Sequence, residues 1–381
     1  MIGKFSIGLL AVLVGCGAPA PSPTSQASSS VPSASGSTST GEPSFPALQT
    51  GTIDQRSTTP ALEYRSTGSY LIWSSGARIS KEADVAPDLF GSTPGGSVTL
   101  LYDNPNRDSR LEFVGGEGTH FAFMEYNRRV LGLGGWKLWY LSGPGTQPAE
   151  IDHGVGGQLP FFAISGHSLV WTAVHGQPEQ SQLLLIDLTT MHRLVLLSAL
   201  PTQTQYWFPS IDGNRIVFGT VESAADGQSD QRHIYVLDVG AQAAPTRLDT
   251  STSASEPVIR GEDVVWKESD PTINFLNAGR LVRYSLTTRV TTPITLPTIS
   301  GLGFTDPSIG NRFVAAWPQS LRDIYLLDLH DNSALKIIDL GPMTTDPTDT
   351  VARSDVAGDL LAYVYGPATG DLELRWVILP H

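Results

Sequence analysis

The feature that most constrains this chain is a motif that recurs about every 48 residues from residue 62 onwards. Each copy contains a short apolar run that ends in an aromatic residue, and successive aromatics are 46 to 51 residues apart. The seven aromatic positions are Trp73, Phe123, Trp171, Phe218, Trp266, Trp317 and Tyr363. A fixed period of this length indicates an array of small structural units rather than one irregular domain.

Each repeat is typical of four short antiparallel strands. A segment such as 209–213 or 257–261 precedes the apolar run, often begins with proline and ends in glycine. We expect that glycine, as in Gly213, Gly261 and Gly310, to supply the positive φ of a tight hairpin. After the run come a variable loop, a second apolar strand, a polar turn and a last strand. The strands are rich in valine, isoleucine, leucine and aromatics, as β-structure requires.

A single four-stranded sheet of this size cannot cover both of its faces, but sheets packed radially around an axis can. The sequence therefore predicts an all-β fold, a single β-propeller over residues 48–381 with seven blades, six being the alternative. The last repeat offers only three strands, at 351–358, 360–365 and 372–379. We expect Leu48–Ile53 to supply its missing outer strand and so to close the ring, which leaves no open sheet edge.

The repeats resemble the TolB-like, WD40-like bacterial β-propeller repeats. The residues that carry the resemblance are P-x-I-x-G-x-R-I-V-F at 209–218 and R-H-I-Y-V-L-D-V at 232–239, with counterparts in the other repeats. The resemblance covers nearly all of residues 62–381 and implies a propeller that presents loops to partners in the cell envelope. TolB itself has six blades and an extra N-terminal domain, so its partners are not carried over to this chain.

The N-terminal region has the layout of an export signal. Residues 1–15 hold one lysine, an apolar run of about ten residues and small residues before Cys16, which is too short for a membrane span. The sequence Leu13-Val14-Gly15-Cys16 resembles a bacterial lipobox, which implies cleavage before Cys16 and lipid attachment to its sulfur. Residues 16–47, rich in serine, proline and threonine, are expected to be a disordered tether. The predicted location is the bacterial cell envelope, outside the cytoplasm and anchored to the membrane by that lipid.

The composition restricts the chemistry. The formal charge of −13 argues against a nucleic-acid partner, because phosphate binding needs clustered lysine and arginine. One cysteine excludes an internal disulfide or a cysteine-based zinc site. The eight histidines show no metal-ligand spacing, and no cofactor motif is present, so we expect neither a metal nor a cofactor. The repeated tryptophans are expected to pack between blades rather than to stack on sugars.

No catalytic motif is complete. Ser210-Ile211-Asp212-Gly213 begins like the Asp-box of sialidases but lacks its threonine-tryptophan end, and no G-x-S-x-G nucleophile motif occurs. We therefore expect a non-catalytic binding module for a protein or for a cell-wall or carbohydrate ligand, acting as a monomer. The alternative is a hydrolase or lyase with acidic residues in the propeller channel. A third possibility is a structural part of an envelope complex.

Long loops on a rigid scaffold commonly carry recognition. Four long loops are the candidates, at 74–87, 174–181, 221–231 and 267–279. Their candidate binding residues are Arg78, Glu82, Asp84, His175, Glu179, Glu222, Asp226, Asp230, Glu268 and Asp270.

Overall fold

The computed structural model describes residues 48–53, 61–75, 88–106, 109–127, 135–155, 159–223, 230–241, 243–269, 279–295, 303–318, 323–340, 349–368 and 372–381. These residues belong to one compact unit, Phe45–His381. Cys16 and the segments 1–15 and 16–47 lie outside the described residues. Within the described part of the chain every regular element is a β-strand. No helix in that part is long and apolar enough to cross a membrane.

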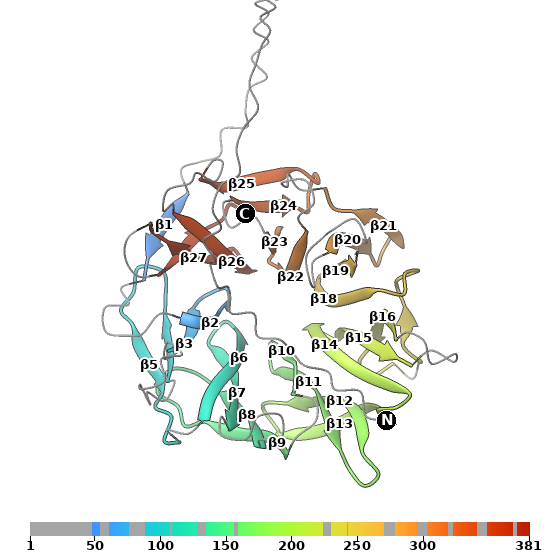
Figure 1. Cartoon of the computed structure of the whole chain (residues 1–381). Helices are drawn as coiled ribbons and strands as arrows, with labels where there is room; N and C mark the ends of the chain where they lie inside the picture. The colour runs from blue at the N-terminus through green and yellow to red at the C-terminus, as the bar shows by residue number, and fades with distance from the viewer. Residues whose placement is uncertain are drawn as a thin grey trace, which may run out of the picture. The chain divides into compact units, whose positions relative to one another are not determined.

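Seven strands lie innermost, around the centre of the ring (Figure 1). They are β2 (Ala61–Ser66), β6 (Ser109–Glu117), β10 (Phe162–Ser165), β14 (Thr204–Asp212), β18 (Ala254–Arg260), β22 (Phe304–Ile309) and β26 (Thr350–Ala357). The second strands, which contain the seven repeated aromatics, are β3 (Leu71–Ser75), β7 (His120–Asn127), β11 (Ser168–His175), β15 (Arg215–Glu222), β19 (Asp263–Ser269), β23 (Phe313–Pro318) and β27 (Leu360–Gly366).

Two further strands complete each sheet on its outer side. The third strands are β4 (Leu89–Ser92), β8 (Gly135–Leu141), β12 (Gln180–Asp187), β16 (Gln231–Asp238), β20 (Gly279–Ser285), β24 (Asp323–Asp328) and β28 (Glu373–Ile378). The outermost strands are β5 (Thr99–Tyr102), β9 (Ala149–Val155), β13 (His192–Ala199), β17 (Thr246–Arg247), β21 (Val290–Pro293), β25 (Ala334–Asp339) and β1 (Gln49–Thr52).

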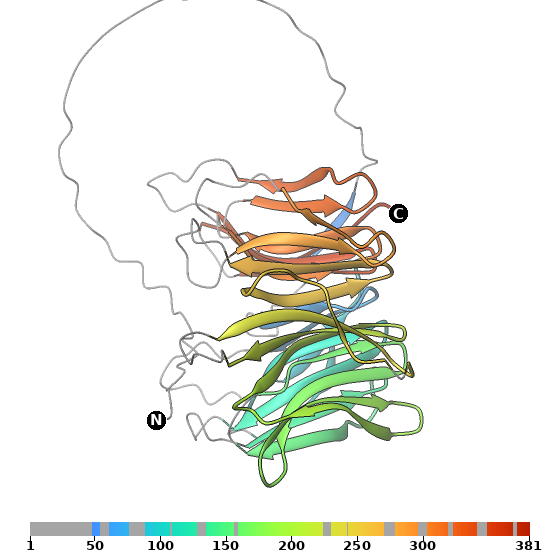
Figure 2. The same ribbon diagram turned by 90° about the vertical axis from the view of Figure 1, so that its right-hand side faces the viewer.

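The described strands form seven four-stranded antiparallel units, which we number as blades 1 to 7 from β2–β5 onwards. Blades 5 and 6 are joined into one longer sheet by a single residue pair, Gly279 with Phe304. Seen from the side, the strands run across the thickness of the ring (Figure 2). This arrangement confirms the predicted all-β propeller.

The ring is closed by the N-terminal strand, as the sequence predicts. β1 pairs antiparallel with β28, from Gln49 opposite Ile378 to Thr52 opposite Arg375. Ile53 follows and is buried with Trp376 in the core between blades 7 and 1. At Gly51 an added Cβ would lie 2.5 Å from the indole of Trp376. Glycine is therefore required there, because the backbone of β1 runs directly across that ring.

The hydrophobic core consists of seven clusters, and each one joins two neighbouring blades. The repeated aromatics lie in these clusters. Trp73, Phe123, Trp171, Phe218, Trp266 and Tyr363 are all buried, and each packs against the preceding blade. A blade therefore buries its apolar faces only against its neighbours, which is the physical reason for the ring.

The hairpin glycines behave as expected with one exception. Gly213 and Gly261 have φ values of 56° and 57°, a conformation that glycine adopts at little cost. We expected a positive φ at Gly310 as well, but its φ is not positive. An added Cβ there would meet the carbonyl oxygen of Gly358 at 2.3 Å. Gly310 is needed for the close approach of two hairpins, not for a left-handed turn.

Candidate functional site

A cavity fills the centre of the described propeller, and we call it the central channel. It has a volume of about 890 Å³, and all seven innermost strands line it. The two ends of the channel are formed by different connections. The hairpins between first and second strands lie at one end. The second strands end, and the third strands begin, at the other end.

At the hairpin end, each pair of neighbouring blades is joined by a hydrogen bond between innermost strands or their turns. Their lengths are 2.5 to 3.2 Å. These bonds join Thr67 to Gly118, Glu117 to Gly166, Ser165 to Gly213, Asp212 to Gly261, Arg260 to Asn311, Ser308 to Val356 and Asp355 to Ser66. Backbone N–H groups are the donors in most of them. In each bond with a backbone donor, the amide of one blade is satisfied by a side chain of the preceding blade.

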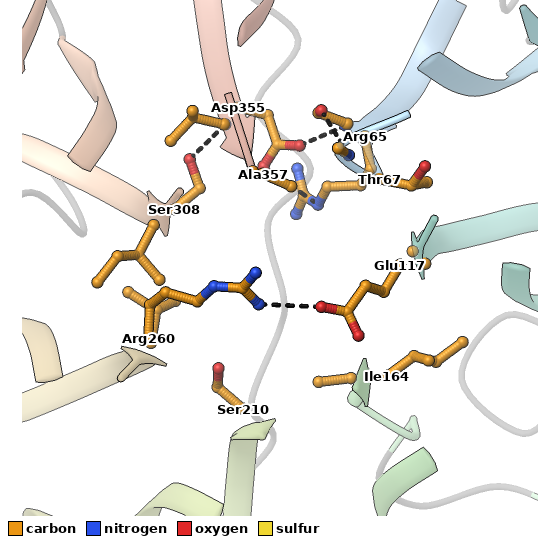
Figure 3. A pocket seen from close by; sticks show the side chains of 18 of the residues that line it. Arg65, Thr67, Glu117, Ile164, Ser210, Arg260, Ser308, Asp355 and Ala357 are labelled. Atoms are coloured by element: carbon orange, nitrogen blue, oxygen red, sulfur yellow. Dashed lines mark hydrogen bonds and ion pairs between the residues drawn. The ribbon is translucent and has the colours of Figure 1, made fainter. Parts of the chain in front are cut away.

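One ion pair crosses the channel at this end. Arg260 of blade 5 donates from Nη1 to Glu117 Oε1 of blade 2 at 2.9 Å, and Figure 3 shows the two side chains meeting from opposite sides. Arg260 also contacts Asp212 and Asn311 of the adjacent blades. A single guanidinium therefore connects four blades and spans the channel.

Deeper in the channel, five of the innermost strands share an unusual backbone position. A β-bulge interrupts each strand, and a non-glycine residue in it has a φ of 43° to 55°. The five residues are Phe113, Phe208, Glu256, Asp306 and Arg353, and all of them line the channel. Bulges redirect side chains and often lie beside functional sites, where backbone strain of this kind accumulates. We call these five positions the bulge ring.

The bulge ring is charged on one side, from blade 5 through blade 7 to blade 1. Arg353 Nη1 donates to Glu63 Oε2 at 3.0 Å. Glu256 accepts a hydrogen bond from Lys267 Nζ, and its other oxygen accepts from the backbone N–H of Asp306 at 3.0 Å. This side of the channel therefore holds charged groups on four consecutive blades, with Glu256, Asp306 and Glu63 as the acids and Arg353 as the base.

Burial acts in opposite directions on the pKa values of the acids and of the base on this side of the channel. Burial raises the pKa of Glu256, and Lys267 opposes that shift. Burial alone would lower the pKa of Arg353, but the carboxylates of Glu63 and Asp306 raise it, so Arg353 keeps its charge. At the hairpin end, burial also raises the pKa of Asp355, against the charge of Arg65.

The opposite side of the bulge ring, in blades 2 to 4, is aromatic. Phe161 lies between Phe113 and Phe208, with ring centroids 5.2 Å and 4.2 Å away. Trp207 extends the group, 5.3 Å from Phe161. All three phenylalanines line the channel, so a molecule there would have ring faces on one side and ionised groups on the other.

The predicted binding residues that the structure describes lie outside the channel. His175 is held by Asp152 at 2.8 Å, between blades 2 and 3. Glu222 accepts hydrogen bonds from Thr220 and Tyr235, and Glu268 from Trp266 and Arg280. Glu179 and Asp230 are exposed. Arg78, Glu82, Asp84, Asp226 and Asp270 lie outside the described residues. None of the described five lines the channel.

Sequence reasoning missed the bulge ring, although a signal was present. In three repeats the channel-lining residue directly precedes a proline, at Phe208-Pro209, Glu256-Pro257 and Asp306-Pro307. Proline has no N–H to give to a ladder and is tolerated in a sheet mainly at edges and bulges. The recurring proline therefore marks the bulge, and the residue before it marks the channel.

Comparison with solved structures supports the fold. The chain is similar to the β-propeller domain of the Trilobed protease from Pyrococcus furiosus, which has an open velcro topology, with a TM-score of 0.60 and 13% identity. The match covers 83% of this chain and 92% of that one. In contrast to the open topology stated for that protein, β1 pairs with β28 here. Identity this low establishes the fold alone.

Two whole peptidases are similar in the same way. Acylaminoacyl peptidase from Pyrococcus horikoshii matches with a TM-score of 0.58 and 13% identity, over 84% of this chain and 51% of its own. A puromycin-hydrolyzing peptidase from Mycobacterium tuberculosis matches with a TM-score of 0.51 and 13% identity, over 84% and 49%. This chain thus spans about half the length of those enzymes. No family model and no curated protein matches the sequence.

Proposed function

We propose that this protein is a lipid-anchored, extracytoplasmic β-propeller that binds a ligand in its central channel without transforming it. The observation that supports this most is the bulge ring, where five innermost strands keep a strained backbone and direct aromatic and charged groups into one cavity. Backbone strain persists only where the surrounding structure imposes it, and it is concentrated at ligand-binding and active sites.

The pairing of the charges favours binding over catalysis. Glu63 and Glu256 are each held by a cation, and Asp355 lies 3.9 Å from Arg65. Fixed ion pairs orient a ligand but offer little free acid or base for proton transfer. Asp306 is the channel carboxylate on this side that has no ion-pair partner among the described residues. The ligands that suit such a cavity include a cell-wall or carbohydrate chain and a segment of an envelope protein, because both combine apolar and hydrogen-bonding faces.

Binding assays on the purified full-length protein test this proposal. Cell-wall glycan fragments and envelope protein fractions are titrated against the wild type, the Phe208→Ala variant and, as a control on the outer surface, the Leu194→Ala variant. Leu194 is 44% exposed on the outermost strand of blade 3. We expect a ligand whose affinity falls at least tenfold in Phe208→Ala and is unchanged in Leu194→Ala. Equal affinity for all three proteins would contradict channel binding.

The alternative, a hydrolase or lyase with an acidic channel site, is tested in the same samples. Chromatography of the ligands after long incubation shows whether they have been cleaved. Turnover that is lost in Asp306→Asn would replace the binding proposal by the enzymatic one.

Membrane anchoring has its own test. Cys16→Ser removes the thiol that the lipid would occupy, so the variant should move from the membrane fraction to the soluble fraction of the envelope. A Cys16→Ser protein that still pellets with membranes after carbonate washing would contradict the anchor.

A further inference from the structure

The charged side of the channel has an excess of negative charge. Besides the Arg260–Glu117 pair, its charged groups include the carboxylates of Glu63, Glu256, Asp306 and Asp355 and the guanidinium groups of Arg65 and Arg353, which line the channel, and the ammonium group of Lys267, which pairs with Glu256. Three of the carboxylates have a cation as partner. Asp306 forms no side-chain hydrogen bond or ion pair with any residue that the structure describes, although its carboxylate lies close enough to Arg353 to help raise the pKa of that guanidinium.

Asp306 also has an unusual backbone conformation. It has a φ of 47° in the bulge of β22, and its own N–H is used by Glu256. Aspartate tolerates the left-handed region better than most residues do. Its carboxylate is therefore presented to the channel by a strained backbone that no described side-chain contact explains.

The aromatic side of the channel attracts a positively charged ligand, as the carboxylate of Asp306 does. Phe113, Phe161 and Phe208 form a continuous group in blades 2 to 4, across the ring from blade 6. Aromatic faces carry negative electrostatic potential and attract organic cations. Both sides of the channel thus favour a positive group, and the phenylalanines add a surface for an apolar body.

We propose that the bulge ring binds a primary ammonium group carried on an apolar or aromatic body, with Asp306 as its counter-ion and the phenylalanines against its body. This inference rests on the proposed function, since it assumes that the channel is the binding site. An anionic ligand of the same shape would meet the excess of carboxylates, and a neutral one would leave Asp306 without a partner.

The test compares three small probes with one ring and different charge: 2-phenylethylamine, its uncharged N-acetyl derivative and 3-phenylpropionate. Each is titrated into the full-length protein by calorimetry at pH 7. We expect the amine to bind at least tenfold more tightly than the N-acetyl derivative and the acid to bind more weakly still. In Asp306→Asn that preference for the amine should disappear, and Asp306→Glu should restore part of it.

Two controls keep the result interpretable. Asparagine is favoured at positive φ, so Asp306→Asn should keep the melting temperature of the wild type. Asp230→Asn removes an exposed carboxylate from a predicted loop and should leave the preference for the amine unchanged.

The outcomes separate the two proposals. If the amine and its N-acetyl derivative bind equally, or if Asp306→Asn keeps the preference, the ammonium inference is overturned. The channel function would then still stand on the loss of ligand in Phe208→Ala. If no probe binds while a channel ligand of another class does, the ammonium inference fails alone. If Asp230→Asn rather than Asp306→Asn removes the preference, the amine site lies in the loop and the inference is wrong.

Discussion

Arg260 and Glu117 are 143 residues apart in the sequence and form a 2.9 Å ion pair across the centre of the propeller. Each residue also contacts an adjacent blade. Arg260 donates to Asp212, and Glu117 accepts from the backbone N–H of Gly166. The pair therefore links the blades across the ring, in addition to the bonds that run around it.

This pair is expected to contribute modestly to stability. Both side chains are about one-third exposed, and exposed ion pairs are worth about 0.2–1 kcal/mol. A double-mutant cycle with Glu117→Gln and Arg260→Gln should give a coupling energy in that range at low salt. It should shrink in 1 M NaCl, where charges are screened. A coupling energy that does not respond to salt would show that the two groups interact by something other than charge.

Closure by β1 should be needed for full stability. Deleting residues 48–53 removes the backbone ladder with β28 and the buried Ile53, so we expect the melting temperature to fall by several degrees. Gly51→Val is the matched point change, because its side chain would clash with Trp376, and it should lower the melting temperature in the same direction. Calorimetry that finds both proteins as stable as the wild type would count against closure by this strand.

The repeated aromatics should act on stability rather than on binding. Trp266 is fully buried between blades 4 and 5, so Trp266→Ala should lower the free energy of unfolding by about 3–5 kcal/mol. Urea denaturation measures this loss. A Trp266→Phe variant, which keeps most of the buried volume, should lose less. If Trp266→Ala unfolds at the wild-type urea concentration, the residue has no packing role.

Asp152 should make the propeller sensitive to acid. Burial alone would raise the pKa of Asp152, but hydrogen bonds from His175 and Trp171 and the charge of Arg193 lower it below its usual value of 3.8. A lowered pKa means that the carboxylate stabilises the fold fully above about pH 4. That contribution is lost as the pH falls below this value through the folded-state pKa.

The Asp152→Asn variant tests this linkage. Near pH 6 it should be less stable than the wild type by about 1.5–3 kcal/mol, the usual value for hydrogen bonds to a charged group. The difference should narrow as the pH falls from 4 to 2. Glu373→Gln, which changes a partly buried ion pair on β28, serves as the control. A stability gap that is constant from pH 6 to pH 2 would refute the account of Asp152.

The sequence predicted the fold well because the fold depends on properties that repeat. The aromatic of each second strand must meet the preceding blade, and this requirement recurs with the period of the repeat. The bonds that join neighbouring innermost strands keep the same spacing, for instance 48 residues between Ser165 and Gly213 and 49 between Asp212 and Gly261. The strand at Gln49–Thr52 was predictable because one blade lacked an outer strand.

The channel could not be predicted in the same way, because its chemistry lies in what the repeats do not share. Phe208, Glu256, Asp306 and Arg353 occupy corresponding bulges in four blades and have different side chains. No single repeat shows that one side of the ring is aromatic and the other charged. The pair Arg260 and Glu117 likewise joins blades 5 and 2, and only the closed ring brings them together.

The central claim, that the ligand is bound in the channel rather than by the outer loops, is tested most directly by site-specific photocrosslinking in intact cells. A photoactivatable amino acid replaces Phe208 in the channel or, in a separate strain, Glu179 on an exposed turn. We predict a crosslinked ligand from position 208 that an excess of the unlabelled ligand displaces, and none from position 179. A crosslink that forms only from position 179 would contradict the account.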